Sequence, residues 1–362
     1  MSKELYSLNY RIISQALSIM IQPFFIIFNL FRYSYKIKDV DVKVILVNEY
    51  HRIGDVIIIS PILSSLKKKY PKAELILICN KQAEGLAIHH NLADTIIGID
   101  APWTNWDWSL KKWWSKIFFF STVIRKKNID LAFSFKGDLR DSFFLWLTKP
   151  KISFGYSFTG GKYFYTHPQK LKNNYHQQER AHNLIEKVGC IKIPNLNINY
   201  NTKGGIVIHP GASDSKRAWP DVYWIDLMQM LSKKDKVCIV KVKDSKEIFE
   251  KLENQRFTFK IFTGNLVDFS NWVKNQKLVI GSDSMAGHLA AFHNISTITI
   301  FGSQDPKLSI PISIKSKSIK PELKCHHKRN HWRLCEKCMS SISPQKVYDE
   351  TIRVLNEIKN QT

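Results

Sequence analysis

Acidic residues are scarce in this chain. Its 362 residues include 31 Asp and Glu against 54 Lys and Arg, which gives a formal charge of +23 at neutral pH. A surplus of this size indicates anionic partners, such as phosphates, nucleic acid or an acidic membrane leaflet. Because the cations are spread over several loops and no nucleic-acid recognition motif is present, we expect no nucleic-acid partner.

Cysteine is also sparse. The six cysteines are scattered rather than spaced as in a small disulfide-rich secreted domain, which favours a reducing compartment. No internal repeat of solenoid period is present, and a hydrophobic content of 44% excludes a disordered chain. A chain of this length has room for two domains of about 100–200 residues each.

A long uncharged run stands near the N-terminus. Residues 12–31 carry no charge, and the run is about as long as a helix that crosses a bilayer. Pro23 and several polar side chains disfavour a straight spanning helix, and no small-residue cleavage site of a signal peptide follows. Three interpretations stay open: an interfacial or re-entrant anchor, a spanning anchor, or a helix docked on the protein itself. We take residues 1–40 as a membrane-associated helical segment.

After this segment, apolar runs alternate with helical periodicity. Residues 43–47 and 74–79 predict buried strands joined by a helix, and the same pattern restarts at residues 206–209. Strand, helix, strand with short connections is typical of a parallel sheet. The sequence therefore predicts an α/β protein with two Rossmann-like domains, residues 41–200 and 201–362.

The first motif that carries chemistry is His-Arg-Ile-Gly-Asp-Val at residues 51–56, where a predicted strand ends and a helix begins. Ligands of open α/β sheets bind at the carboxyl ends of strands, and Gly54 permits a tight turn there. The Asp55 carboxylate has two interpretations. It caps the following helix, or it takes a proton from an acceptor hydroxyl as a general base.

Two later segments are suited to binding a phosphate. Residues 209–213 end a strand in a small-residue turn, and the cations Lys216 and Arg217 follow. Residues 281–289 also follow a strand, and the start of their helix would present N–H groups and a positive dipole end to an anion. The structural alternatives are a solvated loop for the first segment and ordinary helix caps in the second.

These three motifs, followed by Phe-Gly-Ser-Gln-Asp-Pro at residues 301–306, resemble the lipopolysaccharide heptosyltransferases of glycosyltransferase family 9. The likeness runs from about residue 42 to the C-terminus. It implies the GT-B architecture, in which two Rossmann-like domains face a cleft. The N-terminal domain then holds mainly the acceptor, and the C-terminal domain holds the nucleotide-sugar. It also implies an inverting transfer that requires no metal or other cofactor for catalysis.

The resemblance assigns roles to individual residues. Asp55 matches the Gly-Asp carboxylate taken to be the general base of the family. In the third motif, Met285 stands where the family often has glycine, and Glu247 is the candidate for holding the ribose because the expected acidic residue is displaced. ADP-heptose is the expected donor because it is the common donor of the family. The remaining donor-binding candidates are Ser213, Lys216, Arg217, Asp283, Ser284 and His288.

The acceptor side rests on a shorter segment. Lys136 and Arg140 follow another predicted strand, and we expect them to bind an anionic acceptor. The alternative is that Asp138 caps a helix and the two cations lie on the helix surface. His176 and Arg180 fit the family's helix before the interdomain linker, where a packing and capping role is expected.

Five of the ten tryptophans lie between residues 103 and 114, among several lysines. Tryptophan sits at headgroup level while lysine meets anionic lipid, so the segment is typical of a membrane-contact helix. The alternative is that these aromatic side chains belong to the core.

Cysteines gather near the C-terminus. The pair Cys335 and Cys338 has zinc-like spacing, and Cys325 or a histidine would complete the ligand set of a structural zinc. Reduced thiols and a disulfide are the alternatives.

Taken together, these features predict a membrane-associated inverting glycosyltransferase that moves heptose from ADP-heptose onto the inner core of lipopolysaccharide. Its expected partners are the ADP-sugar, the lipid A-core acceptor and an anionic membrane surface, at the cytoplasmic face of the bacterial inner membrane. Two rivals remain. One is a transferase of the same fold acting on a protein or another glycan, and the other is a non-catalytic protein that binds polyanions or membranes.

Overall fold

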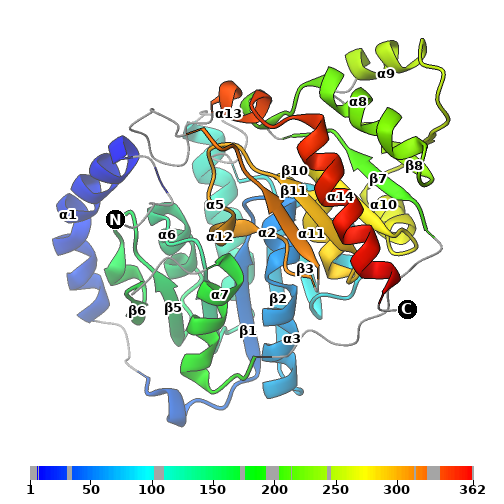
Figure 1. The fold of residues 1–362 in the computed structure, drawn as a ribbon. Helices are drawn as coiled ribbons and strands as arrows, with labels where there is room; N and C mark the ends of the chain where they lie inside the picture. Colours follow the sequence, from blue (N-terminus) through cyan, green and yellow to red (C-terminus); the bar gives the residue numbers. More distant parts are fainter. Residues whose placement is uncertain are drawn as a thin grey trace. The chain divides into compact units, whose positions relative to one another are not determined.

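A computed structural model describes residues 6, 8–30, 35–101, 110–171, 176–192, 204–212, 214–242, 246–313, 315–323 and 335–360, with residues 110–114 described by backbone only. The chain divides into two compact units, Met1–Pro194 (unit 1) and Asn195–Thr362 (unit 2). Each unit is built on a parallel six-stranded sheet covered by helices (Figure 1). The α/β class and the two Rossmann-like halves predicted from the sequence are confirmed.

The strands of unit 1 are ordered β3-β2-β1-β4-β5-β6 across the sheet. They are β1 (Val44–Glu49), β2 (Glu74–Asn80), β3 (Thr95–Ile99), β4 (Leu131–Ser134), β5 (Ile152–Tyr156) and β6 (His167–Gln169). The chain order reverses direction between β1 and β4, which lie side by side. Ligands of open parallel sheets bind at the carboxyl ends of strands on either side of such a switch.

The helices of unit 1 are α1 (Leu8–Leu30), α2 (Ile53–Ile58), α3 (Ser60–Lys69), α4 (Lys81–His89), α5 (Leu110–Arg125), α6 (Leu139–Leu147) and α7 (Gln177–Ile185), with 3₁₀ turns η1 (Ile37–Asp39), η2 (Lys162–Phe164) and η3 (Glu186–Val188). Local caps fix where several of them begin. The Asn80 side chain accepts from the backbone N–H of Gln82 at the start of α4. Asp138 accepts from the N–H of Arg140 at the start of α6, so the cap considered as the alternative for this segment is present.

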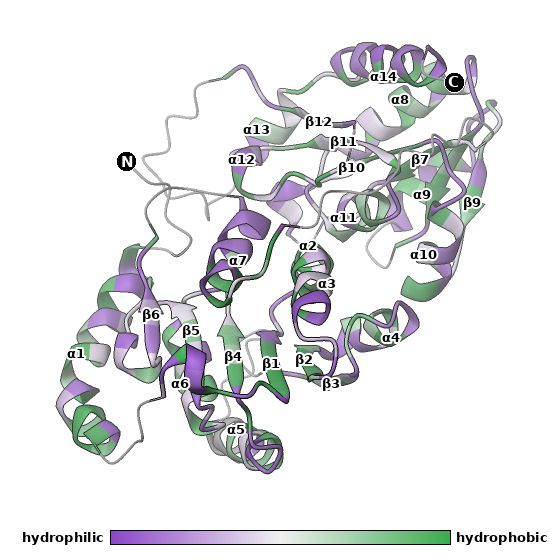
Figure 2. Ribbon diagram, turned by 90° about the horizontal axis from the view of Figure 1, so that it is seen from below, coloured by the Kyte–Doolittle hydropathy of each residue, from purple (hydrophilic) through white to green (hydrophobic). Residues whose placement is uncertain are grey.

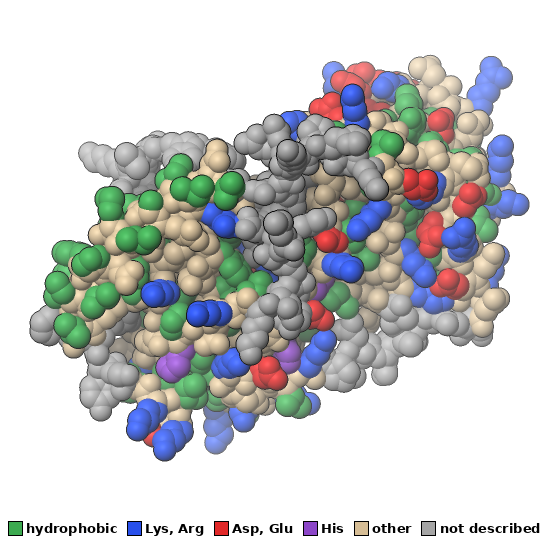
Figure 3. Space-filling model, turned by 60° about the vertical axis from the view of Figure 1, so that its left-hand side comes forward, with side chains coloured by type: hydrophobic (Ala, Val, Ile, Leu, Met, Phe, Trp, Pro, Cys, Tyr) green, Lys and Arg blue, Asp and Glu red, His purple; other side chains and the backbone are tan. Residues whose placement is uncertain are grey.

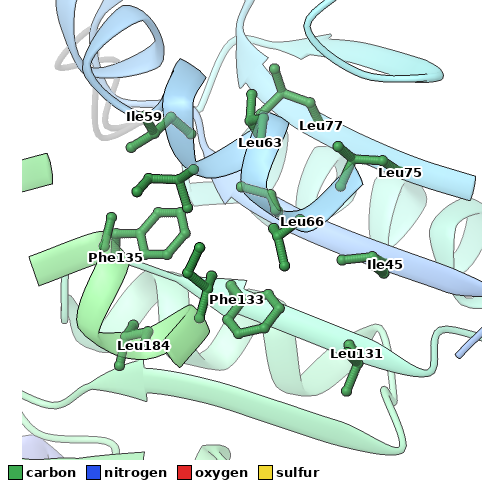
Figure 4. Packing of buried hydrophobic residues seen from close by; sticks show 14 of the residues in the cluster. Ile45, Ile59, Leu63, Leu66, Leu75, Leu77, Leu131, Phe133, Phe135 and Leu184 are labelled. Carbon is green, nitrogen blue, oxygen red and sulfur yellow. The ribbon is translucent and has the colours of Figure 1, made fainter. Parts of the chain in front are cut away.

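Both faces of the unit 1 sheet are buried. Ile45 and Val47 point to one face and Leu46 to the other, because successive side chains of a strand alternate. On the first face Ile45 packs with Leu66 of α3 (Figure 4), and on the second Leu46 packs with Phe144 of α6. The hydrophobic strands β1, β2 and β4 accordingly stand out in Figure 2. This double burial explains why these strands appear in the sequence as unbroken apolar runs.

Unit 2 repeats the plan with strand order β12-β11-β10-β7-β8-β9, so its switch falls between β7 and β10. Its strands are β7 (Ile206–His209), β8 (Val237–Val240), β9 (Lys260–Phe262), β10 (Leu278–Ser282), β11 (Ser296–Ile300) and β12 (Ser316–Ile319). Its helices are α8 (Asp221–Ser232), α9 (Lys246–Leu252), α10 (Leu266–Val273), α11 (Met285–Phe292), α12 (Pro306–Ser309), α13 (Glu336–Ser340) and α14 (Pro344–Lys359), with the 3₁₀ turn η4 (Ser215–Arg217).

The core of unit 2 is anchored by two tryptophans. Trp219 and Trp224 are fully buried, and their rings meet edge to face with centroids 4.7 Å apart. The indole N–H of Trp219 donates to the carbonyl oxygen of Ile342 at 2.9 Å. This bond ties the loop after β7 to the segment that leads into α14. The loop that carries Lys216 therefore has a rigid base.

The N-terminal helical segment expected from the sequence is present as α1, which contains Pro23. By length and composition α1 is able to cross a membrane. In the structure it is docked on unit 1, where Ser14 and Ser18 are buried.

Candidate active site

Asp55 lies in the first turn of α2, just beyond the carboxyl end of β1. The cap of α2 is Arg52, so Asp55 does not have the capping role. The Oδ1 atom of Asp55 is 2.8 Å from the Nζ atom of Lys136, which follows β4 across the switch, and the two side chains are only 12% and 16% exposed. Burial alone would raise the pKa of Asp55, but Lys136 holds that pKa below its ordinary value. The carboxylate is therefore ionised and able to accept a proton.

A second carboxylate stands beside the same lysine. Glu49 is the last residue of β1 and is 1% exposed, and its Oε1 atom is 3.6 Å from the Nζ atom of Lys136. Burial raises the pKa of Glu49 to about 7, although Lys136 opposes the shift. Sequence reasoning missed this residue. The available signal was a charged residue at the end of an otherwise apolar strand.

We expect Glu49→Gln to change how the stability of the fold depends on pH. The folded-state pKa of about 7 lies above the ordinary value of 4.5, so this carboxyl favours the folded state fully below pH 4.5. That contribution is lost as the pH rises through 7. The free energy of unfolding of the variant, measured with urea at intervals across this window, should fall less with rising pH than that of the wild type. Parallel curves would contradict the raised pKa.

A buried hydrogen-bonded cluster fixes the loop that leads to Asp55. Asp141 of α6 places its Oδ2 atom 2.7 Å from the Nε2 atom of His51, and its Oδ1 atom accepts from the hydroxyl of Tyr50 at 2.5 Å. Burial opposes a charge on His51, yet Asp141 raises the pKa of His51 above its ordinary value. This cluster joins the β1–α2 loop to α6 and restricts the position of the Asp55 side chain.

The structure separates the two cations predicted to bind the acceptor. Lys136 lies between the carboxylates of Asp55 and Glu49. Arg140 instead donates its Nε and Nη2 hydrogens to Asp138, at 2.9 and 2.7 Å. Lys136 therefore pairs with Asp55 and Glu49, and contact of either cation with an acceptor stays a prediction.

Helix α7 brings a further cation to this region. His176 accepts from the backbone N–H of Gln178 at 3.1 Å, which is the capping role expected for it. Arg180, one turn on, is 3% exposed, and its Nε atom has no hydrogen-bond partner among the residues that the structure describes. Burial lowers the pKa of Arg180, and the nearby charges of Asp55 and Glu49 oppose the shift.

In unit 2 two of the predicted donor residues, Arg217 and Asp283, meet at the carboxyl ends of the strands. The Nη1 atom of Arg217, in η4, is 3.4 Å from the Oδ2 atom of Asp283, which directly follows β10. One orientation of the Gln304 amide makes two hydrogen bonds to this pair. Its nitrogen donates to the Oδ2 atom of Asp283, and its oxygen accepts from the Nη2 atom of Arg217 at 2.6 Å. Arg217 and Asp283, which are far apart in the sequence, are thus brought together at the switch between β7 and β10.

Buried hydroxyls lie at the same edge. The Oγ atoms of Ser282, Ser284 and Ser303 are buried and have no hydrogen-bond partner in the described parts of the chain. Ser284 occupies the N-cap position of α11, but its side chain makes no capping bond. Buried hydroxyls normally find a partner, so these groups fit a bound anion that accepts hydrogen bonds.

The other predicted donor residues take varied positions. Lys216 is exposed in η4, and Glu247 is exposed in the first turn of α9. His288 is 7% exposed on α11. Ser213 lies outside the described residues. Their roles toward a nucleotide-sugar stay predictions.

The predicted zinc ligands are described in part. Cys335 is the N-cap residue of α13, and Cys338 is buried one turn further on. The backbone N–H of Cys338 donates to the carbonyl oxygen of Cys335 at 3.0 Å, so the two residues share one turn. Cys325 lies outside the described residues, and no cluster of three or more metal-ligating side chains occurs among those described. A structural zinc here stays a prediction.

The tryptophan-rich segment also falls largely outside the description, since residues 102–109 are not described and the side chains of residues 110–114 are not described either. On the described part of α5, Phe118, Phe119 and Val123 are exposed.

Comparison with known proteins finds a matching family model and similar solved structures. Residues 197–338 match the model of glycosyltransferase family 9 (heptosyltransferase). No match is found among curated proteins.

Three similar solved structures each cover 86% to 90% of this chain. A glycosyl transferase family 9 protein from Veillonella parvula has a TM-score of 0.73 at 16% identity, covering 90% of this chain and 100% of its own. The E. coli heptosyltransferase WaaC with ADP has a TM-score of 0.70 at 15% identity, covering 86% and 99%. The E. coli ADP-heptose lps heptosyltransferase II has a TM-score of 0.68 at 15% identity, covering 88% and 100%.

At these identities the likeness is one of fold, and the expected GT-B-like architecture is confirmed. About a tenth of this chain has no counterpart in the Veillonella protein. The resemblance to glycosyltransferase family 9 drawn from three sequence motifs is therefore confirmed, by the family model over residues 197–338 and by the heptosyltransferase fold over most of the chain.

Proposed function

We propose that this protein is an inverting glycosyltransferase that moves a heptose from ADP-heptose onto the inner core of lipopolysaccharide. The observation that carries the proposal is the ionised Asp55, held by Lys136 at the strand switch of unit 1. Asp55 takes the proton of the acceptor hydroxyl as the acceptor oxygen bonds to the anomeric carbon of the heptose. The bond from that carbon to the diphosphate breaks, ADP leaves with the electron pair, and attack from the opposite side inverts the configuration.

In this proposal unit 2 holds the donor. Lys216, Arg217 and the unpartnered serine hydroxyls would stabilise the leaving diphosphate, whose negative charge grows in the transition state. Heptosyltransferase WaaC, which shares the fold, has been solved with ADP and with ADP-2-deoxy-2-fluoro heptose, and this supports an ADP-sugar as donor. The proposed acceptor, the lipid A-core, places the enzyme at the cytoplasmic face of the inner membrane.

Calorimetric titration tests the donor half of the proposal. The purified protein is titrated with ADP-heptose and with a panel of UDP- and GDP-sugars. We expect selective binding of ADP-heptose. Preference for another nucleotide-sugar would leave the fold assignment unaffected but would overturn the proposed reaction.

Lys216→Ala should weaken ADP-heptose binding by about 10- to 100-fold, because a hydrogen bond to a charged group contributes about 1.5–3 kcal/mol. The same calorimetric titration measures the effect. Lys234→Ala, which removes an exposed lysine from the turn after α8, is the matched control and should bind like the wild type. Equal affinities for all three proteins would remove Lys216 from the donor site.

A turnover assay tests the acceptor half. Lipid A-core and a set of purified proteins are each incubated with the enzyme and ADP-heptose, and product masses are compared. Transfer to lipid A-core is the expected result. Transfer to a protein but not to lipid A-core would show that the acceptor is a protein and would overturn the proposed acceptor.

A further inference from the structure

Helix α1 is amphipathic, and its orientation is the reverse of that of an ordinary surface helix. Its polar side chains face the rest of unit 1, and many of its apolar side chains are exposed. The Oγ atom of Ser18 accepts from the backbone N–H of Gly161 at 2.8 Å. Asn29 donates to the carbonyl oxygen of Tyr163 at 2.7 Å and accepts from the indole N–H of Trp146 at 3.0 Å. These bonds hold α1 along unit 1 by groups that a water-exposed helix would turn outward.

The opposite side of α1 is apolar. Ile13, Met20 and Ile27 recur every seven residues, so they lie in one line, and their exposed fractions are 67%, 75% and 57%. Figure 3 shows hydrophobic side chains gathered over this helix, with Lys and Arg side chains at the border. The other exposed large apolar residues of α1 are Leu8, Ile12, Leu17, Ile19, Phe24, Ile26, Phe28 and Leu30. A continuous exposed patch of this kind marks an interaction site.

A bilayer surface is the occupant that fits this patch. The helix has 23 residues, or about 35 Å of length at 1.5 Å per residue, and it is tied to unit 1 near both of its ends. Held in this way it lies flat and sinks its apolar side about 5–10 Å into the interface. The net charge of +23 favours anionic headgroups, at about 1 kcal/mol for each cation near the surface.

Tyr10 of α1 and Tyr6, which precedes α1, contact the loop after β4 that carries Lys136. The Tyr6 hydroxyl donates to the carbonyl oxygen of Lys136 at 3.0 Å. The Tyr10 hydroxyl lies 3.1 Å from both carboxylate oxygens of Asp138, and the guanidinium of Arg140 lies over the Tyr10 ring at 5.1 Å from its centroid. Lys136 therefore contacts Tyr6, which precedes α1, through its backbone, and Asp55 through its ammonium group.

We propose that α1 lies in the interface of an anionic bilayer, with the line of Ile13, Met20 and Ile27 in lipid and with Tyr6 and Tyr10 fixing the loop that carries Lys136. Docking then brings the base to the membrane on which a lipid-linked acceptor is carried. The docking rests on α1 alone, whereas the link to an acceptor rests on the proposed function.

Vesicle co-sedimentation of the full chain tests the docking without any substrate. The vesicles contain phosphatidylglycerol and phosphatidylethanolamine, with phosphatidylcholine vesicles for comparison. Wild type should bind the anionic vesicles, and the triple variant Ile13→Glu, Met20→Glu, Ile27→Glu should bind at least about ten-fold more weakly. The matched control places the same three charges on exposed apolar positions elsewhere: Ile191→Glu, Val222→Glu, Ile261→Glu, whose native side chains are 68%, 50% and 51% exposed.

The control should bind like the wild type. Unchanged binding by the α1 variant would overturn the proposal. A lipid-free wild type that is dimeric, together with a monomeric α1 variant, would show that a second copy covers the patch and would overturn the choice of lipid. Vesicle binding by a wild type that transfers no heptose would support the docking while refuting the proposed function.

Tyr10→Phe tests the link to the site. This variant keeps the ring under Arg140 but loses the bond to Asp138, so vesicle binding and ADP-heptose affinity should match the wild type. Turnover of the lipid-linked acceptor should fall several-fold. Unchanged turnover would overturn the link between α1 and the site.

Discussion

Asp55→Asn should greatly slow glycosyl transfer while the protein still binds ADP-heptose. The amide has nearly the same shape as the carboxylate but cannot take a proton at neutral pH, and a positioned general base contributes about 10²–10⁴-fold to a rate. We therefore expect kcat to fall by about 10³-fold with little change in donor affinity. A discontinuous transfer assay and the calorimetric titration measure the two quantities on the same preparation.

The matched control is Asp226→Asn, which makes the same change at an exposed position of α8. It should leave both kcat and donor affinity unchanged. Retained turnover in Asp55→Asn would remove Asp55 from the mechanism, whereas loss of donor binding in that variant would indicate a disturbed fold.

Lys136→Met should damage both the stability of unit 1 and the activity. It leaves the carboxylates of Asp55 and Glu49 buried without the ammonium group that they share, and removing one partner of a buried ion pair costs about 3–5 kcal/mol. The pKa of Asp55 should also rise, because Lys136 is what opposes the effect of burial on it. With a raised pKa, a smaller fraction of Asp55 is ionised at a given pH, so residual activity should increase as the pH rises.

Urea unfolding and a pH profile of kcat measure the two effects. Lys67→Met is the matched control, because Lys67 pairs with Asp94 at 2.6 Å but both side chains are about two-fifths exposed. An exposed pair contributes about 0–1 kcal/mol, so this control should unfold nearly as the wild type does. Equal losses in the two variants would contradict the buried character of the Lys136 site.

The central strands were predictable from the sequence because they are buried on both faces. In β1, β2, β7 and β10 this burial requires unbroken Val, Ile and Leu runs, which mark a parallel sheet. The outer strands β6 and β9 have three residues each and are partly exposed, so they leave no such pattern. The strands at these two edges of the sheets therefore had to come from the structure.

The position of the motifs at strand ends was predictable for a related reason. They follow strands, and a parallel sheet gathers the carboxyl ends of its strands at one edge. The place of Glu49 in the site was not predicted, because this residue ends the apolar run that marks β1 as a core strand. The contacts of Tyr6 and Tyr10 were not predicted either. They join residues about 130 positions apart in the sequence, and no local pattern encodes such a contact.

The strand switch of unit 1 has a consequence for how the chain folds. Ile45 of β1 pairs with Leu131 of β4, so the centre of the sheet closes a loop of more than eighty residues. Closure entropy must be overcome before such a contact forms, and parallel sheets therefore assemble slowly. During synthesis β1 and β2 can pair early, but Asp55 meets Lys136 only after β4 has left the ribosome. The proposed catalytic corner is thus assembled late, and slow synthesis at low temperature should raise the active fraction of the recombinant protein more than its soluble yield.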